Sequence, residues 1–433
     1  MAKTITIMEA LDLVRSGDYI VTALGAGEGR EFMSNLHTIA PRVKDVTVTD
    51  CMPMGNYEFI DPKYRDSFIL EGWFFTPALR KANESGARVS FIPNHLHLAA
   101  TKRLYYRKPD IYVGIASMPD KNGFVSLSIS NTYEMRQIRE AKTVILEINP
   151  NAPRTHGDAW LNLDDVDYVV ETDYPIPEIP DAEPNEKDLA IGRIIADLIN
   201  DGDCVQLGIG GIPNAVAKSL YGKKDLGIHT EMLTSSMVSL AKAGVITGKK
   251  KQLYPEKMVA AFAMGPKELY DYIDDNPSFM LMDGAYVNDP YTIAQNDNQV
   301  SINTTIEVDV TGQCCSESIG SRQFSGTGGQ ADTAIGAQMS KNGKSIIALY
   351  STAMVKDPAT GEKVPTSKIV TQLKPGAAVS LSRNDVDWLV TEYGAVQLRG
   401  TSLAERAKLI ISIAHPDFRD QLTKEAKALN FLY

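Results

Sequence analysis

The stretch that decides the fold runs from residue 201 to residue 234 and reads DGDCVQLGIGGIPNAVAKSLYGKKDLGIHTEMLT. Its first part predicts a strand followed by a helix. Residues 204–207 form a short apolar run, the glycines after it permit a sharp turn, and Pro213 fits the first turn of a helix. This order of elements is typical of an α/β domain.

The second part of the stretch predicts another strand-to-helix unit. Residues 226–229 read as a strand, Thr230 as the N-cap of a helix, and residues 232–243 as an amphipathic helix. Glu231 then lies in the first turn, where an acid stabilises the helix dipole. Its position alone leaves two roles open, a helix-stabilising acid or a catalytic one.

Together the two units predict a ligand-binding edge. If both strands belong to one parallel sheet, Gly208–Gly211 and Glu231 lie side by side at its carboxyl edge, where open α/β folds bind ligands. Exposed N–H groups at the start of a helix can hold a phosphate, a carboxylate or the oxyanion of an acyl-transfer intermediate. We therefore expect an active site here.

Length and composition predict a cytoplasmic protein of two domains. The chain has 433 residues, which exceeds the roughly 250 to 300 residues over which one core keeps growing. Hydrophobic residues make up 43% and charged residues 23%, as in ordinary globular proteins. No apolar run approaches the ~20 residues needed to span a membrane, and the start carries no signal-peptide pattern. We expect no membrane association.

Charge and cysteine content exclude several classes. A net charge of −10 argues against a nucleic-acid partner, because such binding needs a basic face. The four cysteines are too few for a disulfide scaffold and have no zinc-site spacing, so we expect buried thiols. Lysines near the glycine turn either donate to an anionic ligand or form a solvated face: Lys218, Lys223, Lys224 and 249–251.

A proline-rich segment at 174–188 divides the chain. Its prolines exclude helix and central strand, so we read an extended linker between domains 1–183 and 184–433. Before the linker, strand patterns alternate with helical stretches, which predicts a mainly parallel sheet with crossover helices. The strand patterns are 18–24, 46–49, 89–92, 111–115 and 143–148.

The two halves also resemble each other. Residues 7–20 and 191–205 both read as a helix, a Gly-Asp turn and a strand that leads into glycines. Farther on, 46–51 parallels 226–232, which places Asp50 where Glu231 lies. We therefore predict an α/β fold of two similar open domains with mainly parallel sheets and an active-site cleft between them. The alternative is that the two halves share this order of helix, turn and strand by chance.

Other chemistries fit less well. The dinucleotide fingerprint fails because its last glycine falls at Pro213, and no phosphate-binding P-loop follows. His95 and His97 have no third metal ligand at a recognisable spacing. Glu317 is a competing acid, better read as a hydrogen-bonded structural residue. A second glycine cluster at 324–332 is either another backbone-donor loop or a structural turn.

Five motifs in order make the chain resemble the acetyl-CoA hydrolase/transferase family, and within it the 4-hydroxybutyrate and butyrate:acetate CoA-transferases. They are residues 208–216, 227–232, 325–332, 390–400 and 413–419. The resemblance implies two α/β domains with CoA in the cleft between them. It implies Glu231 as the catalytic residue, with CoA-binding contacts at Gly208, Ile209, Gly210, Gly211, Ile212, Ile306 and Gly329. Thr333 departs from the family, because relatives commonly have phenylalanine after the aspartate.

The resemblance also implies an activity. Glu231 would attack an acyl-CoA thioester and carry CoA as a glutamyl thioester in a ping-pong transfer between short-chain acyl-CoA and carboxylates such as acetate, butyrate or 4-hydroxybutyrate. CoA enters as a substrate, and no metal or permanently bound cofactor is expected. A hydrolase could use the same glutamate, a dinucleotide oxidoreductase is the distant alternative, and a non-catalytic CoA-binding protein would need no acid there. A homo-oligomer is compatible with this reading.

Overall fold

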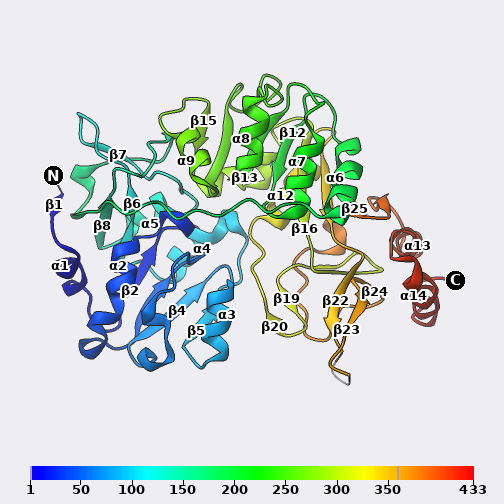
Figure 1. The fold of residues 1–433 in the computed structure, drawn as a ribbon, viewed down its shortest axis with the longest axis horizontal. Helices are drawn as coiled ribbons and strands as arrows, with labels where there is room; N and C mark the ends of the chain where they lie inside the picture. Colours follow the sequence, from blue (N-terminus) through cyan, green and yellow to red (C-terminus); the bar gives the residue numbers. More distant parts are fainter. Residues whose placement is uncertain (1, 358–359) are drawn as a thin grey trace. The chain divides into compact units, whose positions relative to one another are not determined.

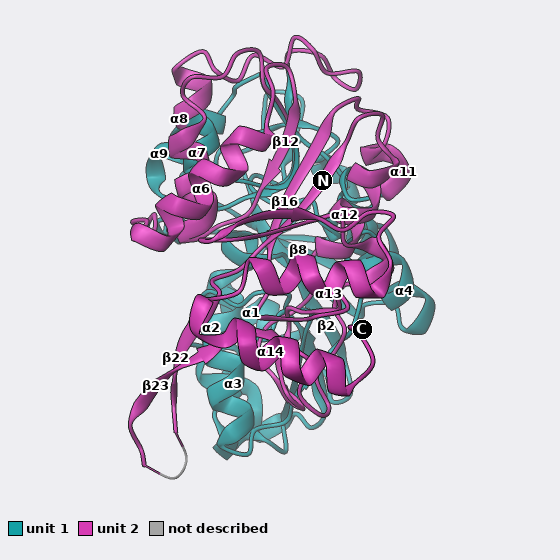
Figure 2. Ribbon diagram, turned by 90° about the vertical axis from the view of Figure 1, so that its right-hand side faces the viewer, with its two compact units in different colours: residues 1–180, 229–238, 257–289 teal, residues 181–228, 239–256, 290–433 magenta. Residues whose placement is uncertain are grey.

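The computed structural model of the chain describes residues 2–357 and 360–433 (Figure 1). Two compact units are distinguished in Figure 2. Unit 1 comprises residues 1–180, 229–238 and 257–289, and unit 2 comprises residues 181–228, 239–256 and 290–433. The longest segment of unit 1 ends close to the predicted division at 183/184, but two later segments return to that unit. Glu231 therefore belongs to unit 1 although it follows the linker.

Unit 1 contains an eight-stranded sheet in which every pair of neighbours is parallel. Parallel neighbours need long crossover connections, which here carry the helices. The sheet confirms the mainly parallel arrangement predicted for the first half. Its strands in spatial order are β1 (Lys3–Thr4), β11 (Tyr168–Glu171), β8 (Thr143–Ile148), β6 (Ile111–Ala116), β2 (Tyr19–Thr22), β3 (Val46–Thr49), β4 (Phe68–Gly72) and β5 (Val89–Phe91).

The helices of this part begin at residues suited to capping. The Thr6 side chain accepts from the Glu9 N–H and the Glu9 side chain accepts from the Thr6 N–H, which starts α1. Thr76 caps α3, with Pro77 in its first turn. Phe32 of α2 packs in one core with strand residues such as Val46 and Val48. The helices are α1 (Ile7–Asp12), α2 (Arg30–Asn35), α3 (Pro77–Glu84), α4 (Ala99–Tyr106) and α5 (Glu134–Glu140).

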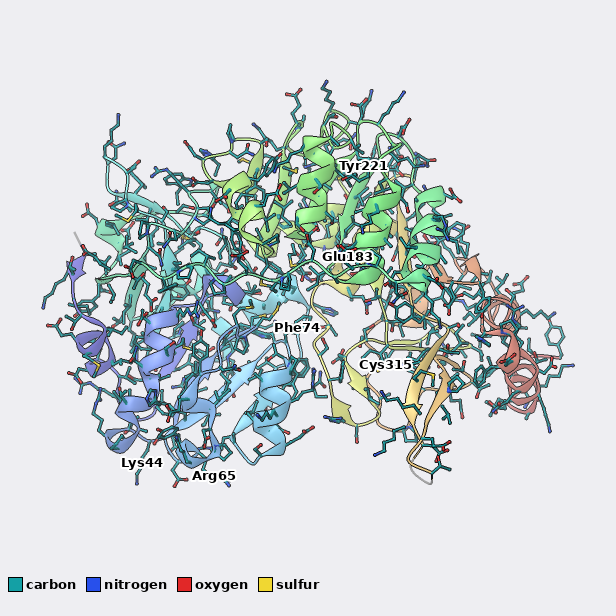
Figure 3. The ribbon with its side chains drawn as sticks, viewed as in Figure 1. Lys44, Arg65, Phe74, Glu183, Tyr221 and Cys315 are labelled. Atoms are coloured by element: carbon teal, nitrogen blue, oxygen red, sulfur yellow. The ribbon has the colours of Figure 1, made fainter. Side chains whose placement is uncertain are left out.

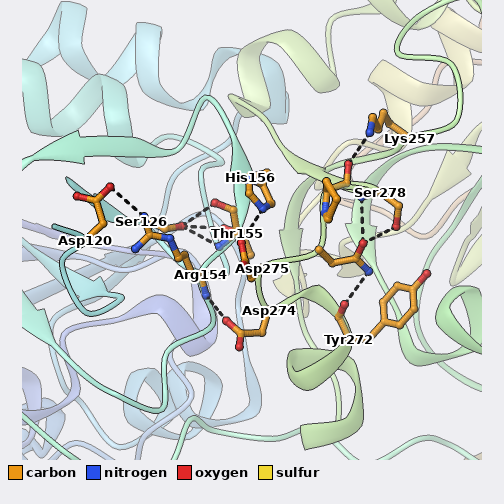
Figure 4. A network of polar contacts seen from close by, with 12 residues as sticks. Asp120, Ser126, Arg154, Thr155, His156, Lys257, Tyr272, Asp274, Asp275 and Ser278 are labelled. Atoms are coloured by element: carbon orange, nitrogen blue, oxygen red, sulfur yellow. Dashed lines mark hydrogen bonds and ion pairs between the residues drawn. The ribbon is translucent and has the colours of Figure 1, made fainter. Parts of the chain in front are cut away.

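Unit 1 also holds four strands in the parallel order β13, β14, β15, β9, of which β13 contributes its residues from 229 onward. Figure 4 shows the polar contacts beside β9. The Arg154 N–H donates to Asp274 Oδ1 at 2.7 Å, and His156 Nε2 lies 3.0 Å from Asp275 Oδ1. The elements are β9 (His156–Gly157), β13 (Gly227–Leu233), β14 (Met258–Ala263), β15 (Phe279–Leu281), α9 (Lys267–Ile273), α10 (Gly284–Val287) and α8 (Ser235–Lys242), which starts in unit 1.

Unit 2 is also built on a mainly parallel sheet. Its strand order is β26, β25, β21, β16, β12, β13, and β13 contributes only its first residues to this unit. The β25–β26 pair is antiparallel and the other pairs are parallel. The strands are β12 (Cys204–Leu207), β16 (Gln299–Thr304), β21 (Lys344–Ala348), β25 (Trp388–Thr391) and β26 (Gly394–Gln397). The helices are α6 (Glu186–Leu198), α7 (Gly211–Ser219), α11 (Pro290–Ile293), α12 (Gln330–Met339), α13 (Leu403–Ser412) and α14 (Pro416–Ala428).

Smaller elements complete both units. Unit 1 adds the antiparallel pair β7 and β10, and unit 2 adds the hairpin of β22 and β23. The bounds are β7 (Phe124–Ser126), β10 (Trp160–Asn162), β17 (Glu307–Asp309), β18 (Cys314–Cys315), β19 (Ser318–Ile319), β20 (Arg322–Gln323), β22 (Thr352–Lys356), β23 (Lys363–Ser367) and β24 (Ile369–Val370). In the described ranges, no helix has the length and apolarity to cross a bilayer.

Two predictions at the linker and at β13 need correction. The predicted linker ends earlier than residue 188, because Asn185 and Asp188 form a capping box that starts α6 at Glu186. The strand predicted at 226–229 continues to Leu233, so Glu231 lies inside β13 and not in the first turn of a helix. Pairing of Met232 with Phe262 on β14 favours the strand over the helical pattern.

The cysteines are confirmed as buried free thiols: Cys51, Cys204, Cys314 and Cys315. Figure 3 labels Cys315 on β18 and, by contrast, Tyr221, which is exposed just beyond the end of α7. Two of the lysines near the glycine turn, for which a donor role and a solvated face were both open, have partners within unit 2: Lys218 Nζ lies 3.0 Å from Glu183 Oε2, and Lys223 Nζ donates to the Ile199 carbonyl at 2.6 Å.

Candidate active site

Glu231 is a half-buried carboxylate on a strand whose other residues are buried. Thr230 pairs with Ala260 and Met232 pairs with Phe262, which fixes β13 against β14 on both sides of Glu231. Side chains alternate along a strand, so Glu231 projects to the same face as His229. The sheet thus holds the backbone of this acid rigidly while its side chain keeps access to solvent.

Asn288 positions the Glu231 carboxylate. Its Nδ2 donates to Glu231 Oε2 at 3.0 Å, and the Asn288 side chain is itself fully buried. The preceding residue is also tied to β13, because His229 Nε2 donates to the Val287 carbonyl at 2.8 Å. Two neighbouring residues at the end of α10 are therefore bound to alternate residues of one strand. This leaves the carboxylate with a defined orientation.

Sequence reasoning missed Asn288, which follows Glu231 by 57 positions in the chain. No motif surrounds it, and an asparagine after a short helix is an ordinary C-terminal residue. The closest signal was the His-x-Glu spacing of His229 and Glu231, which places both on one face once the segment is recognised as a strand.

Acidic side chains surround Cys51 in the same unit. Burial raises the pKa of the Cys51 thiol well above its usual range, and the charges of Asp50, Glu231 and Glu134 raise it further. A thiol with so high a pKa stays protonated and is a poor nucleophile. The raised pKa therefore argues against Cys51 as a nucleophile in this part of unit 1.

The predicted CoA loop follows β12 in unit 2. Gly210 has φ +110°, a conformation that favours glycine, and α7 begins at the next residue. A Cβ atom on Gly211 would lie 2.2 Å from Asp188 Oδ2, so this position has no room for a side chain. Ile209 is 50% exposed at the tip of the loop. The first N–H groups of a helix have no intrahelical partner and can receive an anion.

The side chain of Gln330 links the start of α12 to the end of β16. Gln330 Nε2 donates to the Thr304 carbonyl at 2.8 Å, where β16 ends, and Gly329 is the N-cap residue of α12. Ile306 follows two residues later and is half-buried. Gly329 and Ile306 thus lie within one and two residues, along the chain, of a hydrogen bond that joins α12 to the end of β16.

The glycine loop follows β12 at the edge of the unit 2 sheet where β16 also ends. β12 and β16 are parallel neighbours, with Leu207 opposite Ile302, so their carboxyl ends point the same way. Gly208–Ile212 follows one strand and Ile306 follows the other. Ligands bind open α/β folds at this edge. All seven predicted CoA-binding residues belong to unit 2, and Glu231 belongs to unit 1.

Thr333 has defined partners at the position where it departs from the family pattern. Its Oγ1 accepts from Asn303 Nδ2 at 2.9 Å and donates to the Gly329 carbonyl at 3.0 Å. The departure thus adds polar contacts between α12, β16 and the second glycine cluster, where a phenylalanine would present an apolar ring.

The competing sites have structural explanations. Glu317 is buried, and its Oε2 accepts from Ser380 Oγ at 2.7 Å, which confirms the interpretation as a hydrogen-bonded structural acid. The His95 and His97 rings lie 6.2 Å apart. Over residues 2–357 and 360–433, no group of three or more His, Cys, Asp or Glu side chains is arranged to hold a metal ion.

Family models match both ends of the chain. The acetyl-CoA hydrolase/transferase N-terminal domain matches residues 1–180, and the C-terminal domain of the same family matches residues 265–426. The chain belongs to the acetyl-CoA hydrolase/transferase family. Relatives that are 35% to 40% identical over nearly the whole chain are named CoA-transferases, butyrate enzymes among them. This family member is accordingly a CoA-transferase.

Individual relatives align from end to end. The chain is 40% identical to the succinyl-CoA:cyclohexane-1-carboxylate CoA transferase of Geobacter metallireducens, over 99% of this chain and 96% of the relative. It is also 40% identical to the 4-hydroxybutyrate coenzyme A transferase of Clostridium kluyveri, over 98% and 97%. The crystal structure of RipA from Yersinia pestis superposes with a TM-score of 0.92 at 36% identity, over 99% and 98% of the two chains. The α/β fold of two domains is thereby confirmed.

Proposed function

We propose that this CoA-transferase moves CoA between a short-chain acyl-CoA, such as butyryl-CoA or 4-hydroxybutyryl-CoA, and acetate through a glutamyl-CoA thioester on Glu231. The observation that carries the proposal is the Glu231 carboxylate itself, half-exposed on a buried strand and held by Asn288 Nδ2. Among the acids around Cys51, Asp50 and Glu134 are buried, and Glu231 is the one with a solvent-accessible side chain.

The reaction proceeds in two covalent steps. The Glu231 carboxylate attacks the thioester carbonyl of the acyl-CoA, which gives an acyl-glutamyl anhydride and the CoA thiolate. The thiolate then attacks the glutamyl carbonyl, releases the first carboxylate and leaves CoA as a thioester on Glu231. An incoming carboxylate reverses both steps. Every bond made is matched by one broken and there is no net oxidation or reduction, so the chemistry needs no redox cofactor.

The predicted CoA-binding residues would act on the same substrates. N–H groups of Gly208–Ile212 would stabilise the oxyanions that form and collapse in each step, a contribution that is often the largest in acyl transfer. Ile306 and Gly329 would contact CoA from the end of β16 and the start of α12. Asn288 would keep the attacking oxygen of Glu231 in a reactive orientation.

Hydrolysis is the competing outcome. Water in place of the incoming carboxylate would turn the same thioester into a hydrolase intermediate, so the two activities differ in water access. Product formation from butyryl-CoA with and without acetate separates them. Transfer predicts acetyl-CoA and little free CoA, whereas a hydrolase releases CoA without acetate.

Exchange assays with two isosteric variants test the role of Glu231. Glu231→Gln removes the nucleophilic carboxylate, and we expect exchange between butyryl-CoA and acetate to fall by about a thousandfold or more. Glu317→Gln is the matched control, because its amide oxygen can still accept from Ser380 Oγ. Normal exchange in Glu231→Gln, or a loss confined to Glu317→Gln, would refute the assignment.

A further inference from the structure

Three buried polar side chains lie together near the start of unit 1. Glu28 follows the short helix at Gly25–Gly27, Asp50 follows β3, and Tyr57 is in the next loop. Their exposed fractions are 1%, 0% and 5%. The Glu28 side chain interacts with those of Tyr57 and Asp50, yet among the residues that the structure describes Glu28 Oε1, Asp50 Oδ2 and the Tyr57 hydroxyl have no hydrogen-bond partner with good geometry. Such groups are costly to bury, so their retention calls for a function.

The other oxygen of each acid accepts from a backbone N–H. Asp50 Oδ1 accepts from the Met52 N–H at 3.0 Å, and Glu28 Oε2 accepts from the Met54 N–H at 3.5 Å. One backbone N–H is much less than an ionised carboxylate obtains from water. Two neighbouring carboxyls in this environment cannot both ionise at neutral pH, because each would repel the other in a dry setting.

Electrostatics agree with this geometry. Burial raises the pKa of Glu28 to about 7, and burial together with the charge of Glu28 raises the pKa of Asp50 well above its usual range. Hydrogen bonds with Tyr57, Asp50 and the Met54 N–H oppose the effect of burial on the pKa of Glu28, and so does the charge of Arg30. The other titratable groups that interact with the pair are Tyr57, Tyr133, Tyr174 and Cys51, whose raised pKa values keep them uncharged at neutral pH.

The pair is fixed in the same unit as Glu231. Glu134 Oε1 accepts from the Leu24 N–H at 2.8 Å, just before the loop that carries Glu28, and from Ser130 Oγ at 2.6 Å. Ser130 forms a bridge with Phe262 on β14, the strand beside β13. On the other side, the charges of Asp50 and Glu231 both act on the Cys51 thiol.

We propose that Glu28 and Asp50 share one proton, and that this proton permits the acceptor carboxylate to bind beside Glu231. The inference rests on the proposed function. The acceptor is an anion that must approach the Glu231 carboxylate, and each further negative charge nearby in a poorly solvated environment opposes its binding. While the proton stays between Glu28 and Asp50, the pair carries a single charge at most. Loss of this proton adds one negative charge to the pair.

The proton affects the two substrates differently. The reacting end of an acyl-CoA is an uncharged thioester, so an additional charge on the pair opposes its binding less than that of acetate. The KM for acetate should therefore rise with pH while the KM for butyryl-CoA changes little. Glu28 and Asp50 are specificity-determining residues in this account, because they set which charge state of ligand the site accepts.

Steady-state kinetics over about pH 5.5 to 8.5 test the inference. In the unmodified protein we expect the KM for acetate to rise about tenfold as the pH increases, because one added negative charge at close range has an effect of this order. The midpoint of the rise should lie near the pKa of Glu28. Glu28→Gln and Asp50→Asn should flatten the rise. Glu147→Gln is the matched control, since Glu147 is also buried with its pKa raised to about 7 but binds α2 instead. Glu147→Gln should show the same rise in the KM for acetate as the unmodified protein.

Two results would overturn the inference. One is a rise of equal size in Glu28→Gln and Asp50→Asn. The other is a parallel rise in the KM for butyryl-CoA. Melting curves show whether each variant is folded. If one of the two variants does not fold, the KM profiles of the other variant and of the unmodified protein test the inference. Trapping of CoA on Glu231 in Glu28→Gln separates this failure from a failure of the proposed function, since the thioester forms before any acceptor binds.

Discussion

Asn288 is the residue that the structure adds to Glu231. Its Nδ2 donates to the carboxylate at 3.0 Å, and a hydrogen bond to a charged group contributes about 1.5 to 3 kcal/mol. Asn288→Ala should therefore lower kcat by about tenfold to a hundredfold, with KM for acyl-CoA changed little. Asn276→Ala is a suitable control, because Asn276 bonds to Tyr272 and Ser278 instead. Unchanged kcat in Asn288→Ala would show that the bond does not orient the nucleophile.

Single residues also mark the limit of prediction at this scale. Glu231 could be singled out because a short motif surrounds it, and the glycines of 208–211 because a turn requires them. Asn288 and Glu28 could not, because their roles depend on contacts that only the folded chain creates. Asp50 could be aligned with Glu231 through the internal repeat, but the burial that gives it a high pKa is a property of the folded unit.

At the scale of elements, the junction of β12 and α7 allows a stability test. Gly210→Ala forces a side chain into φ +110°, which costs about 1 to 3 kcal/mol. Gly211→Ala places a Cβ atom 2.2 Å from Asp188 Oδ2, whose side chain is already bound to Asn185 and Tyr350. Both variants should melt at lower temperature and bind acyl-CoA more weakly.

Gly222→Ala is the matched control for these variants, because open space surrounds its Cβ position and its φ is not positive. We expect its melting temperature to equal that of the unmodified protein. If Gly211→Ala had the same melting temperature as Gly222→Ala, Asp188 would be free to move, and the close approach of Gly211 to Asp188 would have no structural role.

Strands were predicted well where apolar runs are short and bounded. Residues 46–49 and 143–148 form strands with the predicted limits. The failure came at β13, where polar His229, Thr230 and Glu231 interrupt the apolar pattern and a helical periodicity follows. Parallel pairing with β14 overrides that local preference. Local sequence could identify the catalytic candidate while misjudging the element that carries it.

At the scale of the whole molecule, buried acids predict how stability changes with pH. Burial raises the pKa of Glu147 to about 7, although Phe32 N–H, Glu31 N–H and Tyr174 OH donate to its carboxyl group. The folded state thus holds a proton that the unfolded chain releases near the usual value. The associated stability is complete below pH about 4.5 and is lost as pH rises to about 7.

Melting temperatures of Glu147→Gln and the unmodified protein test this dependence. The unmodified protein should lose stability over that window, and the variant, which cannot ionise at this position, should lose less of it. The difference should amount to a few kcal/mol at most, because a shift of one pKa unit corresponds to about 1.4 kcal/mol. Parallel pH profiles would contradict the assignment to Glu147.

The overall architecture was predictable because it follows from periodic patterns. Alternating strands and helices indicated mainly parallel sheets, and the resemblance of 7–20 to 191–205 indicated two similar domains. The limits of the compact units were not readable, because 229–238 and 257–289 join unit 1 through strand pairing that no linker composition announces. Pairing across long sequence separations is the step that local patterns leave open.

The central claim is that Glu231 carries CoA, and the most direct measurement is the mass of the peptide that contains it. The protein is incubated with butyryl-CoA without acetate, digested and analysed by mass spectrometry. The account predicts that the Glu231 peptide gains CoA through a thioester that hydroxylamine cleaves and that Glu231→Gln lacks. An unmodified Glu231 peptide in a protein that exchanges CoA, or CoA attached at Glu317, would contradict it.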